Sequence, residues 1–186
     1  MGDGRWAMSS EPDMAQRRSP SADCLAQRVV VRRFDPAHDT QALRECLIEH
    51  QNFHRSLEPS WPEGAAIVYN YMTYLETECA THNGCILMAH YGEEAAGFVC
   101  VVATTRGESP EDPSPLAWIH ELYVKSEHRR RGVASLLMAE AERFARAGGA
   151  HVLRLGVLDR NEGARAFYAS HGFAEQARIL TKHLED

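Results

Sequence analysis

Three consecutive arginines and a glycine, Arg129, Arg130, Arg131 and Gly132, have the side-chain types that bind phosphate. Guanidinium groups are permanently charged, forked donors, and glycine lets the backbone come close to a ligand. Apolar residues recur after them at intervals of three and four, which predicts a helix over about 133–147. Because a helix begins with unpaired N–H groups and the positive end of its dipole, the pattern favours a phosphate, and a diphosphate best. Taken alone, the same pattern is also typical of a solvated surface.

A strand is predicted immediately before the arginines. Residues 118–124 are rich in β-branched and aromatic side chains. After the predicted helix, Gly148 and Gly149 provide a helix end, and the apolar run 151–158 predicts a buried strand. Because a helix crosses between the two strands, we expect them to be parallel.

Elsewhere, hydrophobic periodicity alternates between the spacing of helices and that of strands. This predicts an α/β (α+β) chain with a mixed central sheet of six to seven strands and four helices. The further helices are expected at about 36–55, 62–81 and 161–171, and the further strands at 28–34, 85–91, 95–105 and, as one or two strands, 173–184. Asp35 and Pro36 match the cap and first position of a helix. Gly97, inside a strand, indicates a bulge or a close backbone approach.

Composition and charge limit the kinds of protein that the chain can be. Its 186 residues, 44% of them hydrophobic and 25% charged, suit one ordinary globular domain, which we place at 28–186. Residues 1–27, which contain Gly, Ser, Pro, Asp and Arg without periodicity, are expected to be a disordered tail. A net charge of −6 argues against broad nucleic-acid binding. No apolar run approaches the roughly 20 residues that span a bilayer, so we expect no membrane partner.

The cysteines and histidines give no strong sign of a metal. The five cysteines are scattered without a Cys-x-x-Cys pair, which favours a reducing compartment, by default the cytoplasm, over disulfides or a zinc site. His50 and His54 are four residues apart on a predicted helix, a spacing that can hold a metal, but the Glu of a His-Glu-x-x-His motif and a third ligand are missing. We therefore expect no metal, and place both histidines on the rim of a substrate pocket or on plain surface.

Several short motifs follow one another in a fixed order along the chain. They are Arg129-x-x-Gly132-x-Ala134, then Asn161, then Phe167-Tyr168, then Gly172-Phe173. With these motifs and this order of elements, the chain resembles the GNAT superfamily, the Gcn5-related N-acetyltransferases that use acetyl-coenzyme A. The resemblance covers about residues 28–184, and Ala134, where many members have Gly, is an allowed variant. It implies that the fourth and fifth strands splay apart and that the cofactor lies in the gap.

The resemblance also implies a role for each matching residue. Asn161 is expected to hydrogen-bond the pantetheine arm or the adjoining backbone, and Tyr168 to meet the leaving sulfur. The strand residues expected to pair with the pantetheine, and to aim an N–H at the thioester oxygen, are Leu122, Tyr123 and Val124. The residues expected to hold the pyrophosphate are Arg129, Arg130, Arg131, Gly132, Val133, Ala134 and Ser135. Without the resemblance, Tyr168 would be interpreted as a helix aromatic packed in the core.

A base must take a proton from the amine, because an alkylammonium with a pKa of about 10.4 cannot attack. His120 lies where family members often carry a base, and a neutral imidazole of pKa about 6.5 suits the task. Glu121 is the second candidate, although alternation along a strand sends it to the opposite face unless a bulge shifts the register. A chain of water molecules is the third, in which case His120 is an ordinary buried histidine. No cysteine lies in a nucleophile motif, which disfavours a covalent cysteine route.

The expected function is direct transfer of acetyl from acetyl-CoA to a primary amine of a small molecule, a peptide terminus or a lysine. Glu49, Glu58 and Glu63, near the first two helices, hint at a cationic amine, although ordinary surface carboxylates would look the same. The alternative from another class is a non-catalytic acyl-CoA sensor that retains the cofactor loop. No nucleic-acid partner is expected, and a homodimer is compatible with the sequence.

Overall fold

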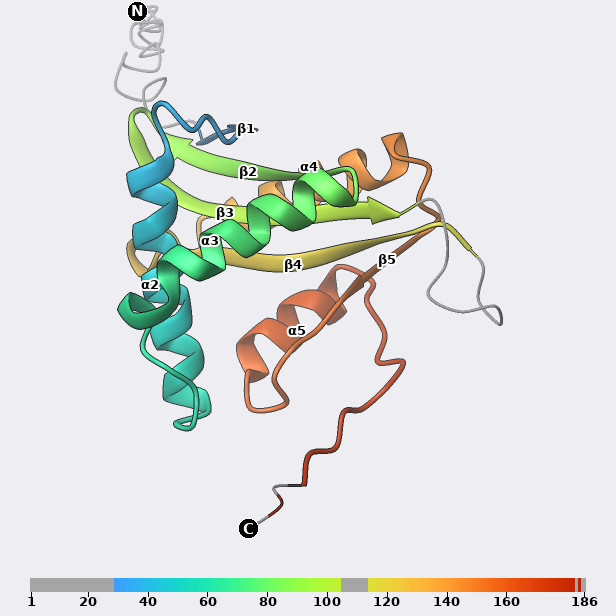
Figure 1. Ribbon diagram of the computed structural model, residues 1–186. Coiled ribbons are helices and arrows are strands. Elements are labelled where there is room, and N and C mark those ends of the chain that lie inside the picture. The colour runs from blue at the N-terminus through green and yellow to red at the C-terminus, as the bar shows by residue number, and fades with distance from the viewer. Residues whose placement is uncertain (1–28, 105–113, 183, 185–186) are drawn as a thin grey trace, which may run out of the picture.

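The computed structural model describes residues 29–104, 114–182 and 184, so the tail predicted at 1–27 lies outside the described residues. Within them, five strands and four α-helices follow one another (Figure 1). In order these are β1 (Val29–Arg33), α2 (Thr40–Leu57), α3 (Gly64–Thr81), β2 (Gly84–Tyr91), β3 (Glu94–Thr104), β4 (Leu116–Val124), the 3-10 helix η1 (Ser126–His128), α4 (Val133–Ala147), β5 (Val152–Leu155) and α5 (Glu162–Ser170). The α/β class and the four helices are as predicted.

The strands form one mixed sheet in the order β1-β2-β3-β4-β5. The first three ladders are antiparallel, whereas β4 and β5 are parallel, as the crossing of α4 between them predicts. The parallel pairing is short: it runs from Leu116 opposite Val152 to Ile119 opposite Leu155. In the described part of the chain, residues 120–124 of β4 therefore have no strand beside them on the β5 side.

Helices cover both faces of the sheet, with α3 in front of it and α4 behind it in Figure 1. On the first face, the residues buried in the core include Leu43 and Leu47 of α2, Leu75 of α3 and Phe98 of β3. On the second face they include Val133, Leu137, Met138 and Ala141 of α4, with Phe167 and Tyr168 of α5 packed against them. Since each fully buried Leu or Phe contributes about 1.5–3 kcal/mol of transfer free energy, these two cores hold β4 firmly from both sides.

The prediction of six to seven strands is wrong for the described residues, which contain five. Residues 173–182, expected to be strand, have no regular secondary structure and run away from the sheet (Figure 1). Their apolar side chains Ile179 and Leu180 are 95% and 91% exposed. A strand is stabilised by a hydrogen-bonded neighbour and a buried face, and apolar content in a sequence guarantees neither.

The first helix also begins later than predicted, at Thr40 with Asp39 as its N-cap. Asp35 and Pro36 instead form the turn before it, in which the Asp39 N–H donates to the Asp35 carbonyl over 2.8 Å. Asp39 is buried, and its carboxylate accepts two hydrogen bonds from Arg32, at 2.5 and 2.7 Å. This ion pair holds the N-cap residue against β1, and the local cap pattern does not reveal it.

A β-bulge interrupts the middle of the β3–β4 ladder. Glu121 pairs with Cys100, whereas Ile119 pairs with the next residue of β3, Val101. His120 is therefore an extra residue on β4. Such a bulge turns the side chains that follow it relative to those before it.

A second bulge lies in the β2–β3 ladder, beside Gly97. A Cβ atom on Gly97 would lie 2.3 Å from the carbonyl oxygen of Tyr123, so β4 approaches β3 more closely here than any side chain would allow. Both features predicted for Gly97, a bulge and a close backbone approach, are confirmed.

Candidate active site

The bulge brings two acid–base side chains onto one face of β4. The imidazole of His120 lies beside α3, with Nδ1 3.5 Å from Tyr74 Oη and Nε2 3.6 Å from a carboxylate oxygen of Glu78. Glu121 lies on the same face, where it accepts a hydrogen bond from Tyr71 of α3. Simple alternation would put His120 and Glu121 on opposite faces, but the bulge that was the stated exception is present, and its extra residue shifts the register.

Glu121 is a buried carboxylate held by two partners. Its Oε2 lies 3.0 Å from Nδ1 of His50 in α2, and only 9% and 10% of the His50 and Glu121 side chains are exposed. Burial would raise the pKa of Glu121, but the hydrogen bonds from His50 and Tyr71 outweigh it and hold the pKa below its ordinary value. Burial and the nearby carboxylate also raise the pKa of Tyr71. Glu121 is therefore a fixed negative charge at neutral pH.

His120 differs from Glu121 in its charge. Its side chain is 21% exposed. Burial lowers the pKa of His120, against the opposing effect of the carboxylates of Glu78 and Glu121. The imidazole is therefore neutral at pH 7, with a lone pair that can accept a proton, while the carboxylate beside it can attract a cation.

Two histidines of α2 extend this polar group. The ring centroids of His50 and His54 lie 4.2 Å apart, and the ring of Trp61 meets His54 edge-on at 5.4 Å. Burial, with a further contribution from His50, lowers the pKa of His54 to about 4. His50 is buried rather than on plain surface. Its contact with Glu121 could not be inferred from helix spacing, because it joins two distant parts of the sequence.

The loop before α4 has an unusual backbone at two of the predicted phosphate-binding residues. Gly132, the N-cap of α4, has a φ of 82°, and Arg130 has a φ of 62°. Among the described side chains none caps this helix, and its first hydrogen bond runs from the Leu136 N–H to the Gly132 carbonyl. The N–H groups of residues 133–135 consequently have no partner within the helix. They are oriented as an anion would require.

The three arginines are not equivalent. Nε of Arg129 donates to the Val124 carbonyl over 3.0 Å, and its guanidinium lies 5.3 Å from the ring of Phe53 and 5.7 Å from that of Tyr123. Arg129 therefore ties the loop to β4 and α2. All three arginines are exposed, but Arg129 is engaged by these contacts, so Arg130 and Arg131 are the ones placed to meet a ligand from solvent.

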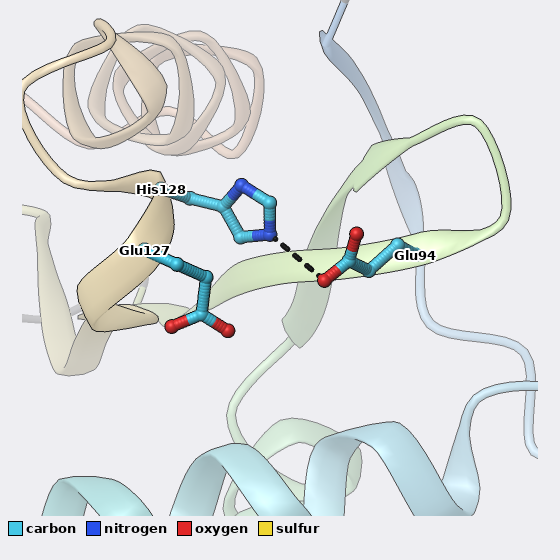
Figure 2. Close-up of side chains that lie close together, drawn as sticks. All are labelled: Glu94, Glu127 and His128. Carbon is cyan, nitrogen blue, oxygen red and sulfur yellow. Dashed lines mark hydrogen bonds and ion pairs between the residues drawn. The ribbon is translucent and has the colours of Figure 1, made fainter.

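The segment η1, directly before the arginines, is anchored to the β2–β3 hairpin by His128 (Figure 2). Its buried ring stacks on Tyr91 at 5.2 Å, and Nε2 lies 3.2 Å from Oε1 of Glu94. Glu127 lies nearby, and one potential ligand atom from each of His128, Glu94 and Glu127 lies within 4.8 Å of the others. Across the described ranges this is the one group of three that could hold a metal ion, although both carboxylates are exposed. The sequence did not indicate it, because the hairpin and η1 are far apart in the chain.

The residues expected to pair with pantetheine lie at the end of β4. The Tyr123 side chain points toward α2, where its hydroxyl donates to Glu49 over 2.9 Å, while Leu122 packs on the α4 side. Val124 ends the strand. Since β5 pairs with β4 only as far as Ile119, no described strand pairs with residues 122–124 on this edge.

The acidic residues that hinted at a cationic substrate are engaged by the protein itself. Glu58 lies 3.3 Å from Nη1 of Arg160, and Glu63 lies 2.7 Å from Nη1 of Arg55. With Glu49 bonded to a tyrosine, each of these three acidic residues has a partner within the protein.

Asn161 caps α5, where its Oδ1 accepts a hydrogen bond from the Ala164 N–H over 3.1 Å. At the other end of the helix, Nε2 of His171 lies 3.1 Å from Oγ of Ser135 in the first turn of α4. This contact joins α5 to the loop that carries the arginines.

Tyr168 lies on α5, half-buried against the α4-side core, with its ring 5.7 Å from that of Phe173. Burial raises the pKa of Tyr168 to about 12, and the negative charge of Glu121 adds to the effect. The phenol therefore keeps its proton at neutral pH and can donate it.

The chain matches the family model described as Acetyltransferase (GNAT) family over residues 50–173, and it belongs to this family. An uncharacterized N-acetyltransferase in the pepI 3′ region of Lactobacillus delbrueckii subsp. lactis is 31% identical over 106 residues, which are 55% of this chain and 61% of that protein. The uncharacterized N-acetyltransferase YycN of Bacillus subtilis (strain 168) is 32% identical over 75 residues, 40% of this chain and 48% of that protein. The chain thus spans between about half and three-fifths of the length of these relatives.

Solved structures of lower identity share the fold. A putative acetyl transferase from Pyrococcus furiosus is 18% identical with a TM-score of 0.66, over 84% of this chain and 100% of that one. The aminoglycoside N-acetyltransferase AAC(6′)-Iy, solved in complex with CoA, is 19% identical with a TM-score of 0.63, over 86% and 97%. Both comparisons support the GNAT fold with a mixed sheet. None of the described helices has the length and apolar character that a membrane crossing requires.

Proposed function

We propose that this chain is an enzyme that transfers the acetyl group of acetyl-CoA directly to a primary amine. The observation that carries the proposal is the bulge in β4, which brings a neutral imidazole, His120, and a buried carboxylate, Glu121, onto one face. They lie where β4 has just separated from β5, on the strand that leads into the arginine loop. Membership of the GNAT family and the CoA complex of the structural neighbour support the same assignment.

The start of α4 suits the diphosphate of CoA. The unpaired N–H groups of residues 133–135 and the exposed side chains of Arg130 and Arg131 would hold it, since N–H groups at a helix start and charged forked donors both favour phosphate. The open edge of β4 at residues 122–124 would take the pantetheine arm by strand-like hydrogen bonds, and a backbone N–H there would stabilise the charge that develops on the thioester oxygen. The acetyl thioester itself is supplied by the co-substrate.

His120 is the proposed base. The ammonium form of the acceptor is attracted by Glu121, and the imidazole nitrogen of His120 removes a proton so that the amine can attack the thioester carbon. The nitrogen–carbon bond forms, the carbon–sulfur bond then breaks, and the phenol of Tyr168 donates its hydrogen bond or its proton to the departing thiolate. The second proton that the attacking nitrogen loses balances the proton taken up by the thiolate. His50 and Tyr71 serve by keeping Glu121 ionised and oriented.

Release of free CoA thiol across a panel of amines and peptides tests the proposal. We expect a subset of primary amines to accelerate thiol release well above the rate without acceptor, with an acetylated amine as the product. Initial rates measured at several concentrations of both substrates should give converging rather than parallel lines, because direct transfer requires both substrates bound at once. Tight binding of acetyl-CoA without turnover for any amine would indicate a sensor instead, and absence of binding would contradict the cofactor site.

A further inference from the structure

Two cysteine thiols meet at the end of α3. Cys79 lies in the last turn of α3 and Cys100 lies in β3, and their sulfur atoms are 3.6 Å apart. Cys100 is fully buried, whereas Cys79 is half-buried. The close fit depends on Gly84, because a Cβ atom there would lie 2.8 Å from the Cα of Cys79. A larger residue at position 84 would push the end of α3 away from the sheet.

Only one of the two sulfurs can be reached from outside. Cys79 lines a surface pocket of about 270 Å³, together with Arg33, Glu76 and Cys85. A small oxidant that enters this pocket can reach Cys79, whereas Cys100 is fully buried and does not line the pocket.

The two thiols also differ in acidity. The hydrogen-bond contact with the Cys100 thiol lowers the pKa of Cys79, although burial and the carboxylates of Glu78 and Glu76 oppose it. The same hydrogen bond, with burial, raises the pKa of Cys100. Cys79 is therefore the sulfur that ionises more readily, and the thiolate is the reactive form of cysteine.

We propose that Cys79 and Cys100 form a reversible disulfide, which makes the end of α3 a site of oxidative modification. The Cys79 thiolate attacks an oxygen of hydrogen peroxide, the O–O bond breaks, hydroxide leaves, and Cys79 becomes a sulfenic acid. The Cys100 sulfur then attacks the Cys79 sulfur; the S–S bond forms, the S–O bond breaks, and the Cys100 proton departs with the oxygen as water. In total, two thiols lose two hydrogens, and one peroxide is reduced to two water molecules.

The bond requires only a small movement. A disulfide has an S–S length of about 2.05 Å, so the two sulfurs must approach by roughly 1.5 Å. Cys79 is the side chain that can move, because α3 ends shortly after it, at Thr81. Cys100 is held in the middle of the sheet by ladders on both sides.

The crosslink lies beside the candidate active site. Cys100 is opposite Glu121 in the β3–β4 ladder, and Glu78, the neighbour of Cys79, is the residue that contacts Nε2 of His120. Oxidation would therefore pull on the contact between Glu78 and the proposed base. The disulfide itself does not depend on the proposed function, and its test needs no substrate.

The test uses the reduced full chain and hydrogen peroxide as the oxidant. We expect the number of titratable thiols to fall from five to three, and the intact mass to fall by two hydrogens. Digestion without a reductant should yield one crosslinked peptide pair that contains Cys79 and Cys100. Dithiothreitol should restore all five thiols.

Matched variants assign the bond. Cys79→Ser should abolish the crosslink. In Cys100→Ser, Cys79 should still be oxidised but should form no disulfide, because its partner thiol is absent. Cys46→Ser and Cys85→Ser, which remove thiols whose pKa burial raises to about 12 and about 11, should leave the crosslink unchanged. Should Cys100→Ser not fold, Cys79→Ser carries the test, because its side chain is partly exposed. A crosslink in Cys79→Ser, a crosslink to another cysteine, or five intact thiols in the folded wild type under excess peroxide would overturn the proposal.

Discussion

Burial shifts the pKa values of His120 and Glu121 in opposite directions. It favours the neutral form of each, and His120 is neutral at pH 7, but the hydrogen bonds from His50 and Tyr71 keep Glu121 ionised. One side chain is thereby ready to accept a proton, and its neighbour carries the negative charge that, in the proposed mechanism, would draw a cationic amine. The division of roles follows from the partners on α2 and α3 rather than from the two residues alone.

His120→Gln should remove the acidic limb from the pH profile of kcat/KM and lower kcat by about 100- to 10,000-fold. Because burial lowers the pKa of His120, the limb should lie below about pH 6.5, and wild-type activity should fall as the pH drops through it. Glu121→Gln should instead raise KM for a cationic amine and retain the limb. His151→Gln, at an exposed histidine away from this face, is the matched control. If Glu121→Gln loses the limb and His120→Gln retains it, Glu121 is the base.

Tyr168→Phe keeps the ring and removes only the hydroxyl, so it separates packing from chemistry. The variant should fold, bind acetyl-CoA with nearly unchanged affinity and transfer acetyl about 100- to 10,000-fold more slowly. Single-turnover kinetics with an amine from the panel measures this step directly. Since the pKa of Tyr168 is raised to about 12, the difference should persist across the neutral range. Equal single-turnover rates would leave Tyr168 with a packing role only.

The types of these residues could be predicted from the sequence, but their grouping could not. A basic side chain, an acidic neighbour and a tyrosine at the expected spacing were all visible. The bulge was only an alternative, because its presence depends on how many residues of β3 lie opposite a given stretch of β4. The contact of Glu121 with His50 likewise requires α2 to be folded against the sheet.

At the scale of elements, the loop between β4 and α4 is held on three sides. His128 fixes its beginning to the β2–β3 hairpin, Arg129 ties it to β4 and α2, and Ser135 contacts His171 beyond α5. A positive φ at Arg130, which costs about 1–2 kcal/mol in the left-handed region, is maintained by these anchors. The loop is therefore formed before any ligand arrives.

Replacement of both Arg130 and Arg131 by Ala should weaken acetyl-CoA binding at least tenfold, since charge-assisted hydrogen bonds contribute roughly 1.5–3 kcal/mol each. Isothermal titration calorimetry at fixed ionic strength measures the change. Arg143→Ala, at an exposed arginine farther along α4, is the control and should bind normally. Arg129→Ala should lower the melting temperature as well, because it removes the contact with Val124. Unchanged affinity in the double variant would exclude the arginines from the cofactor site.

Elements with a strong internal pattern were predictable, whereas those that depend on a distant neighbour were not. The periodicity of α4 and the glycines that end it gave its bounds directly. Ile179 and Leu180 have strand-forming character, but their segment has no neighbour to pair with in the described residues. The start of α2 was misplaced because the local cap pattern does not reveal the ion pair of Asp39 with Arg32, on the preceding strand.

At the scale of the whole molecule, the polar group beneath α2 makes folding sensitive to acid. His54 has a folded pKa of about 4, lowered by burial, whereas an unfolded histidine titrates near 6.5. Between these values the unfolded chain binds more protons than the folded one. The free energy of unfolding therefore falls as the pH drops through this window, and is constant again, for this group, below it.

His54→Gln should flatten the dependence of the unfolding free energy on pH between about 6.5 and 4, because glutamine does not titrate. Denaturant unfolding at several pH values measures the slope. The remaining slope should come from other buried histidines with lowered pKa values, such as His90 and His120. His151→Gln, at an exposed position, should retain the wild-type slope, and an unchanged slope in His54→Gln would contradict the burial argument.

The bulged strand β4 is the one element that borders both proposed substrates. In the proposed arrangement, side chains facing the acceptor would come from α2 and α3, which precede it in the chain, while the groups facing acetyl-CoA would come from α4 and α5, which follow it. Donor recognition and acceptor choice would then be encoded in two successive stretches of sequence. Grafting residues 40–81 from a relative onto this chain would change which amine is chosen while leaving the affinity for acetyl-CoA intact. In proteins with this layout, selectivity for the amine can change when only the helical hairpin of α2 and α3 is exchanged.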